Sequence, residues 1–194
     1  MTTSIFTWAY LVGLSAGSVI RAIYSRRLER DRGTDRRERE RDMLLLLPFM
    51  GMIVIPLVYV LTSWLTFANY RLPAWAGWAG VVLFSSGLWL LWRSHADLGR
   101  NWTPTLKVRD GHLLVTEGVF RYIRHPMYAA HLLWAIGQPL LLQNWIAGWA
   151  MLATFIPVYL VRVRREERMM LEHFGESYRL YMKRTGRVIP GLRR

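Results

Sequence analysis

Apolar residues gather in five long runs that alternate with polar segments along the chain. Because a hydrocarbon core of about 30 Å needs about 20 apolar residues in a helix, runs of this kind predict membrane-spanning helices. The last two runs are shorter and are joined by Gln143 and Asn144, which predicts a tight helical hairpin. The pattern therefore predicts an all-α, integral membrane helical bundle of about five spans, which cover Ile5 to Ile23, Met43 to Phe67, Ala74 to Trp92, Met127 to Leu142 and Trp145 to Val161.

The glycine and proline residues inside these runs are compatible with a bundle of membrane helices. Gly13 and Gly17 are four residues apart in the first run, a spacing that allows a neighbouring helix to approach closely. Pro48 and Pro56 lie inside the second run. Membrane helices tolerate proline when neighbouring groups satisfy the carbonyls that it leaves without a donor.

The spans and the polar segments between them predict a single membrane domain over residues 1–194. Residues 1–92 hold three spans and a basic loop at 24–42, in which Arg alternates with Asp and Glu. Such a segment is typical of a solvated cytoplasmic loop or a frayed surface helix. Residues 93–194 hold a polar segment, the hairpin at 127–161, and a charged amphipathic helix that we expect from Arg162 to Lys183.

Basic residues lie almost entirely on one side of this topology. Nine lie between Arg21 and Arg41, six between Arg93 and Arg124, and ten between Arg162 and Arg194, whereas Arg71 alone falls on the opposite side. The positive-inside rule then places the N-terminus outside and the C-terminus in the cytoplasm, as an odd number of spans requires. The net charge of +13 would by itself suggest nucleic acid, but this distribution indicates membrane orientation and anionic lipid headgroups instead.

The amino-acid composition excludes several kinds of active site. Hydrophobic residues make up 53% of the chain, which is high for a soluble domain of this size. The absence of Cys excludes disulfides, thiol catalysis and Cys-based zinc sites. The five His residues show no metal-ligand spacing, and the chain holds no nucleotide-binding glycine loop, so we expect no metal. His131 lies one turn into an apolar run, where a packing or hydrogen-bonding role is expected.

The first stretch with candidate chemistry precedes the fourth run. Pro126 suits the first turn of a helix, where its missing N–H is not needed. The N–H groups of Met127 and Tyr128 would then point toward the cytoplasm without helical partners, which makes the helix start a site for carboxylate or phosphate. Arg124 and His125 add positive charge there, although both could equally be interfacial anchors.

The second stretch follows the fifth run. Arg162 and Glu166 are four residues apart, so they share one helix face with the residues at 169, 170 and 173. A structural salt bridge is one interpretation, although Arg before Glu is the weaker order for such a pair. A basic and an acidic group just below the hydrocarbon could instead bind a zwitterion, or two substrates of opposite charge.

Several motifs in one order carry a family resemblance over the C-terminal half, from Asp97 to the end. The run RHPMY, from Arg124 to Tyr128, resembles the signature of the isoprenylcysteine carboxyl methyltransferase family. The N-terminal half matches only as apolar spans, and the five-span plan resembles the compact prokaryotic members. The other matching motifs are DLGRNW, DGHLLVTEGVF, RHPMYA, QNW, RVRREE and HFGESYRLYMKRTGRVIP.

The resemblance implies that residues 93–194 are the catalytic half, with a cytoplasmic cofactor-binding region. It implies S-adenosylmethionine as the cofactor and a prenylated-cysteine carboxylate, or a similar lipophilic group, as the methyl acceptor that reaches the site from the bilayer. Arg162 would bind the acceptor carboxylate, and Arg162 and Glu166 are the expected catalytic residues. Phe120 departs from the Tyr that members often carry. The cofactor-binding residues implied are His112, Leu113, Leu114, Val115, Phe120, His125, Pro126, Met127, Tyr128 and Glu166.

Other functions stay open at this point. The same chemistry could act on a phospholipid amine or a small thiol, although an amine acceptor needs a base and none is obvious. An NADPH-dependent enzyme resembling sterol reductases would share the HPxY-like ending, but this chain is short for that fold. A membrane protein without catalysis, whose arginines only set topology, is the remaining interpretation. In each case we expect a multi-pass protein of a prokaryotic cell membrane.

Overall fold

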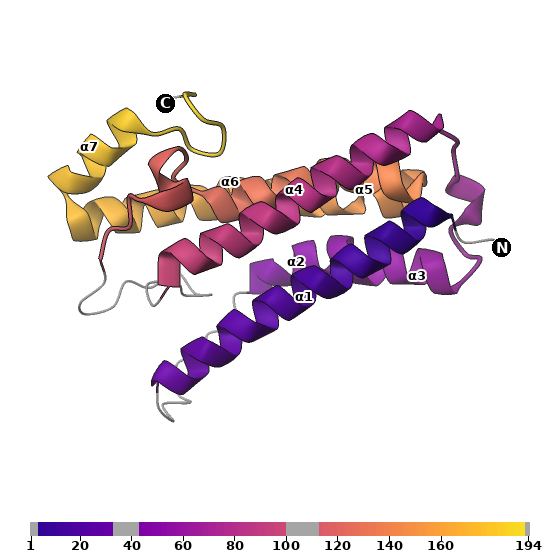
Figure 1. Cartoon of the computed structure of the whole chain (residues 1–194), viewed down its shortest axis with the longest axis horizontal. Helices are drawn as coiled ribbons and strands as arrows, with labels where there is room; N and C mark the ends of the chain where they lie inside the picture. Colours follow the sequence, from indigo (N-terminus) through magenta and orange to yellow (C-terminus); the bar gives the residue numbers. More distant parts are fainter. Residues whose placement is uncertain (1–3, 33–42, 100–112, 193–194) are drawn as a thin grey trace.

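The computed structural model describes residues 4–32, 43–99 and 113–192 as a bundle of helices. Figure 1 shows α1, α4 and α6 extended along the molecule, with the N-terminus at one end and α7 at the other. The described chain contains α1 (Ile5–Arg32), η2 (Met43–Leu45), α2 (Leu46–Phe49), η3 (Met50–Val54), α3 (Ile55–Leu61), η4 (Thr66–Ala68), α4 (Ala74–Leu98), η6 (Gly118–Arg121), α5 (Pro126–Leu142), α6 (Trp145–Phe174) and α7 (Glu176–Arg184).

The predicted all-α membrane fold is confirmed. Over the described residues, extended pairing is limited to two isolated bridges, Asn69 with Asn144 and Ile123 with Gly186. α5, with 17 residues, is shorter than the length that a full crossing usually takes. Four stretches of the described chain are long and apolar enough to cross a membrane, which makes this an integral membrane protein: Ile5–Arg27, Met43–Leu61, Ala74–Leu98 and Trp145–Phe174.

The helix boundaries extend or interrupt the predicted runs. α1 continues past Ile23 to Arg32, so part of the basic segment is helical, and residues 33–42 lie outside the described chain. The prediction of one continuous helix from Arg162 to Lys183 is wrong, because the chain turns at Gly175 between α6 and α7. Gly175 has φ of 53°, in the left-handed region that favours glycine, and its N–H bonds the carbonyl of Leu171.

Proline in the second span is accommodated by two side chains from neighbouring helices. Pro56 has no N–H, so it cannot bond Met52 in an α-helical turn or Gly51 in the wider π-turn of η3. The Tyr10 hydroxyl donates to the Met52 carbonyl at 2.5 Å, and Gln138 Nε2 donates to the Gly51 carbonyl at 3.0 Å. Gln138 thereby ties α5 to the interrupted helix, and it also donates to the Ala147 carbonyl of α6 at 2.6 Å.

Replacing Gln138 with leucine should lower the stability of the folded bundle. The change keeps a similar volume but leaves the carbonyls of Gly51 and Ala147 buried without this donor, so we expect a loss of about 1–3 kcal/mol. Tyr10→Phe removes one hydroxyl and should cost less. Detergent-titrated unfolding of both variants measures the effect, and a Gln138→Leu protein as stable as its parent would contradict this account.

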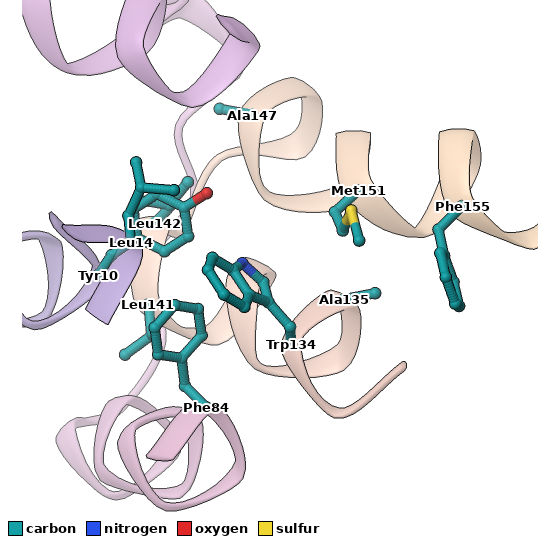
Figure 2. Close-up of a cluster of buried hydrophobic side chains, with 10 residues drawn as sticks. All are labelled: Tyr10, Leu14, Phe84, Trp134, Ala135, Leu141, Leu142, Ala147, Met151 and Phe155. Carbon is teal, nitrogen blue, oxygen red and sulfur yellow. The ribbon is translucent and has the colours of Figure 1, made fainter. Parts of the chain in front are cut away.

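Small residues bring α1, α4 and α5 together around the core, as the spacing of Gly13 and Gly17 predicts. A Cβ on Gly13 would lie 2.0 Å from Phe84 Cε1, and one on Gly17 would lie 2.8 Å from Trp134 Cζ3. The Phe84 ring packs against Tyr10 and Trp134, with centroids 5.4 and 4.5 Å away. Figure 2 shows these rings with Leu14 of α1 and the apolar side chains of α5 and α6 that complete the core.

The hairpin between α5 and α6 is held by Asn144, which is fully buried. Its Oδ1 accepts from the N–H groups of Ile146 and Ala147, at 3.0 and 2.8 Å, and caps α6. Its Nδ2 donates to the Leu65 carbonyl at 2.6 Å and to Asn69 Oδ1 at 2.8 Å. The cap therefore also ties the hairpin to the loop after α3, which sets the register of α6 against α5.

Candidate active site

The C-terminal tail returns to the start of α5. The backbone N–H groups of Arg124 and His125 donate to the carbonyls of Gly186 and Arg187, at 2.8 and 2.9 Å. Pro126 occupies the first turn of α5, as predicted, and His125 precedes it without a side-chain cap. The N-terminal end of α5, His125 to Tyr128, forms its mouth. The tail frames this mouth on one side, and the His125 side chain does not cap the first turn.

Three predicted site residues meet beside this mouth. The Tyr128 hydroxyl of α5 donates to Glu166 Oε1 of α6 at 2.5 Å, and Arg162 Nε donates to the Tyr128 oxygen at 3.2 Å. Arg162 Nη2 lies 3.7 Å from Glu166 Oε1, so the helical ion pair exists as well. The Arg162 side chain is 6% exposed and that of Glu166 is 22% exposed, which leaves the acid as the more accessible member.

His125 joins this group through both ring nitrogens. Its Nδ1 lies 3.4 Å from Glu166 Oε2, and its Nε2 lies 3.3 Å from Glu167 Oε1. Burial alone would lower the pKa of His125, but the hydrogen bonds and charges of Glu166 and Glu167 outweigh it and raise that pKa. A ring that donates from both nitrogens is the imidazolium, so His125 adds positive charge between two acids.

Glu167 forms a second centre that sequence reasoning missed. Glu167 Oε1 accepts from Arg124 Nε and Nη2, at 3.4 and 3.3 Å, and from Arg187 Nε at 3.0 Å. The Arg124 side chain is fully buried and also donates to the carbonyls of Met182, at 3.0 Å, and Thr185. The Glu166-Glu167 doublet was the available signal, because consecutive helical residues point about 100° apart and can serve different neighbours.

The other predicted cofactor residues that the structure describes lie on the approach to α5 or in its first turn. Leu113, Leu114 and Val115 lie in a segment without regular structure, where Leu113 is exposed and the other two are half-buried. Pro126 is buried and Met127 half-buried. His112 lies outside the described chain. The direct side-chain contacts therefore join His125, Tyr128, Arg162 and Glu166 of the predicted set.

The turn at η6 is anchored to two other helices. Asp97 Oδ2, at the end of α4, accepts from the Val119 N–H at 2.9 Å. Gly118 has φ of 60°, and a Cβ there would lie 2.1 Å from the same Asp97 oxygen, so glycine is needed on both counts. Phe120 is buried, and its carbonyl accepts from the Tyr181 hydroxyl of α7 at 2.6 Å.

A small apolar hollow begins at the Tyr128 ring. It lies between α5, α6 and the tail, and its walls are apolar or aromatic side chains. Its volume of about 20 Å³ is close to that of one water molecule, so it marks an apolar surface beside Tyr128 and not a ligand-sized cavity. It is lined by Tyr128, Leu132, Phe155, Ile156, Tyr159 and Val188.

Several known proteins are similar to this chain in sequence. The profile of the isoprenylcysteine carboxyl methyltransferase (ICMT) family matches residues 78–172. The protein-S-isoprenylcysteine O-methyltransferase of Dictyostelium discoideum is 31% identical over 121 residues, which are 59% of this chain and 49% of that protein. The enzyme of the same name from Schizosaccharomyces pombe is 35% identical over 84 residues, 43% of this chain and 36% of that protein.

A longer alignment and a solved structure agree with these matches. Protein-S-isoprenylcysteine O-methyltransferase B of Arabidopsis thaliana is 28% identical over 143 residues, 73% of this chain and 72% of that protein. The eukaryotic intramembrane Ras methyltransferase ICMT has a similar structure, with a TM-score of 0.53 and 25% identity over 77% of this chain and 50% of that one. The present chain thus spans half or less of the Dictyostelium and Schizosaccharomyces relatives. The family match includes α5 and the residues of α6 that form the site, so this part of the chain is similar to the isoprenylcysteine carboxyl methyltransferase family.

Proposed function

We propose that this protein is an S-adenosylmethionine-dependent membrane methyltransferase that acts on the carboxylate of a prenylated cysteine or a similarly lipophilic acceptor. Similarity to the family supports the reaction class, since relatives bear the name protein-S-isoprenylcysteine O-methyltransferase. The observation that carries the proposal is the contact of Tyr128, Arg162 and Glu166 where the apolar part of α6 meets its charged part.

The side chains present fit the charged end of the cofactor. Glu166 is a partly exposed carboxylate, which suits an ammonium group, and the uncapped first turn of α5 suits a carboxylate. S-adenosylmethionine supplies a methyl group on a positively charged sulfur. The other residues proposed to hold it are the predicted ones, from His112 to Val115, Phe120, and from His125 to Tyr128.

Arg162 is proposed to orient the acceptor. A carboxylate is ionised at neutral pH, so it needs no general base to become a nucleophile. In the proposed transfer, one acceptor oxygen would take the methyl group, the neutral thioether would leave, and no proton would be released. The fork of Arg162 can hold a carboxylate in one orientation. Alignment of reactants alone can contribute about 7–11 kcal/mol, so positioning is the main task of these residues.

The two substrates are proposed to arrive from different phases. With the N-terminus outside and the C-terminus in the cytoplasm, as the basic residues indicate, the site lies at the cytoplasmic boundary. The cofactor would reach it from the aqueous side. The apolar side chains beside Tyr128 are proposed as the surface that the lipid part of the acceptor contacts.

Two measurements test the proposal on the purified full chain. Transfer of a labelled methyl group to a farnesylated cysteine analogue should exceed transfer to a phospholipid extract. Calorimetry should show binding of S-adenosylhomocysteine and none of NADPH. Methylation of the lipid extract alone would replace the acceptor, and heat with NADPH alone would overturn the reaction class.

A further inference from the structure

One face of α1 is directed at the helices that carry the site. Gly17, Arg21 and Tyr24 are spaced by four and three residues, so they lie on a single helix face. Gly17 touches Trp134 of α5, where a Cβ would lie 2.8 Å from the ring. Tyr24 packs against His95 of α4, with ring centroids 4.8 Å apart. Arg21, between the two contacts, therefore faces the space between α4 and α5, whose helices lie beside α1 in Figure 1.

Arg162 reaches the same space from α6. Its Nε bonds the Tyr128 hydroxyl at 3.2 Å. Tyr128 and His131 both pack on the Phe155 ring, with centroids 6.3 and 5.9 Å away. His131 lies one turn before Trp134 on α5, at the level that Arg21 occupies one turn after Gly17. The two arginines thus approach the mouth of α5 from opposite helices.

Among the described residues, positive groups outnumber acids in this space. Arg21 lies within electrostatic range of Arg162, His95 and His131. Glu166 pairs with Arg162, but within the described part of the chain no carboxylate forms an ion pair with Arg21. The Arg21 side chain is exposed, so a ligand can reach it. Two guanidinium groups at a membrane boundary attract an anion and repel a cation, because less water is present there to screen the charges.

We infer that Arg21 is a second acceptor-binding arginine, which together with Arg162 makes the site select an acceptor with a carboxylate over an amine or a thiol. The inference rests on the proposed function and specifies its substrate class. A protonated amine would be repelled by both arginines, and a neutral thiol would gain nothing from them. A carboxylate can accept hydrogen bonds from both and keep a lone pair directed at the methyl donor.

The test compares two ligands that differ only in charge. N-acetyl-S-farnesylcysteine and its carboxamide are titrated by calorimetry into the full chain in neutral phosphatidylcholine nanodiscs, with saturating S-adenosylhomocysteine. The wild-type protein should prefer the acid, and Arg21→Gln should weaken binding of the acid about tenfold with the carboxamide unchanged. Arg21→Lys keeps the charge and should lose less. Arg26→Gln, an exposed arginine on another face of α1, is the matched control.

The outcomes separate this inference from the proposed function. Binding does not depend on turnover, so equal affinity of wild type and Arg21→Gln for the acid overturns the role of Arg21, which is then a lipid anchor only. An equal loss for acid and carboxamide also overturns it, because that pattern reports a structural defect. Absence of methyl transfer with intact acid selectivity would instead remove the proposed reaction and keep the anion site.

Discussion

Glu166→Ala and Arg162→Ala should each reduce kcat/KM for methyl transfer about 100-fold or more while the protein still folds. Glu166 contacts Tyr128, His125 and Arg162, so its loss removes the acid proposed to meet the ammonium of the cofactor. Loss of Arg162 removes the group proposed to orient the acceptor. A charge-assisted hydrogen bond contributes about 1.5–3 kcal/mol, and misplacement of the reacting atoms adds to that loss.

The two variants should fail in different ways. Glu166→Ala should weaken binding of S-adenosylhomocysteine, measured by calorimetry, and leave acceptor binding nearly unchanged. Arg162→Ala should do the reverse. Glu172→Ala and Arg165→Ala are matched controls, because both residues are exposed on the same helix. Wild-type turnover in both site variants would remove these two residues from the mechanism.

Apolar runs identified the membrane helices because burial in hydrocarbon leaves a local mark on the sequence. Helix ends that depend on one residue could also be predicted from the sequence, as with Pro126 at the start of α5. Gly175 carried such a signal too, since a glycine that follows a helical turn containing His173 is typical of a helix end. The predicted continuous helix overlooked it because charged residues continue on both sides.

Contacts between distant segments left no local mark. The prolines of the second run predicted that neighbours must satisfy freed carbonyls, but nothing in the sequence indicated that Tyr10 and Gln138 would do so. In the same way, Arg124 meets the Thr185 carbonyl, 61 residues away, only because the tail folds back to α5. Periodicity reports the face that a side chain occupies, and tertiary packing decides which partner it meets there. The contact of Tyr128, Arg162 and Glu166 was therefore more predictable than the contacts that hold the tail.

Glu167→Gln should have the largest effect on stability, about 3–5 kcal/mol in the free energy of unfolding. Glu167 is the acid shared by Arg124, His125 and Arg187, and its side chain is only 8% exposed. The amide cannot balance the charge of Arg124, whose side chain is fully buried. Removal of one member of a buried ion pair is costly for that reason, since the other charge stays away from water.

Other hydrogen bonds of Arg124 and the partial exposure of Arg187 limit the structural change expected in Glu167→Gln. Arg124 keeps the Met182 and Thr185 carbonyls as acceptors, so the helix ends near them should remain in place. Arg187 loses its acid, and its side chain is 34% exposed, so water can replace that partner. We therefore expect Arg187→Gln alone to cost about 1 kcal/mol or less, after allowance for solvent screening.

Unfolding in detergent distinguishes this buried centre from ordinary surface charge. Glu176→Gln makes the same chemical change in a pair with Arg179 whose side chains are 64% and 68% exposed, and it should change stability by less than about 0.5 kcal/mol. In Glu167→Gln, trypsin should also cut the tail near Arg187 faster, because the ion pair of Arg187 with Glu167 is one of the contacts that hold this segment against α6. If Glu167→Gln and Glu176→Gln unfold at the same detergent fraction, Glu167 does not hold the mouth of α5 together. Glu166 and Glu167 would then not have the separate roles proposed for them, which are substrate binding for Glu166 and support of the site for Glu167.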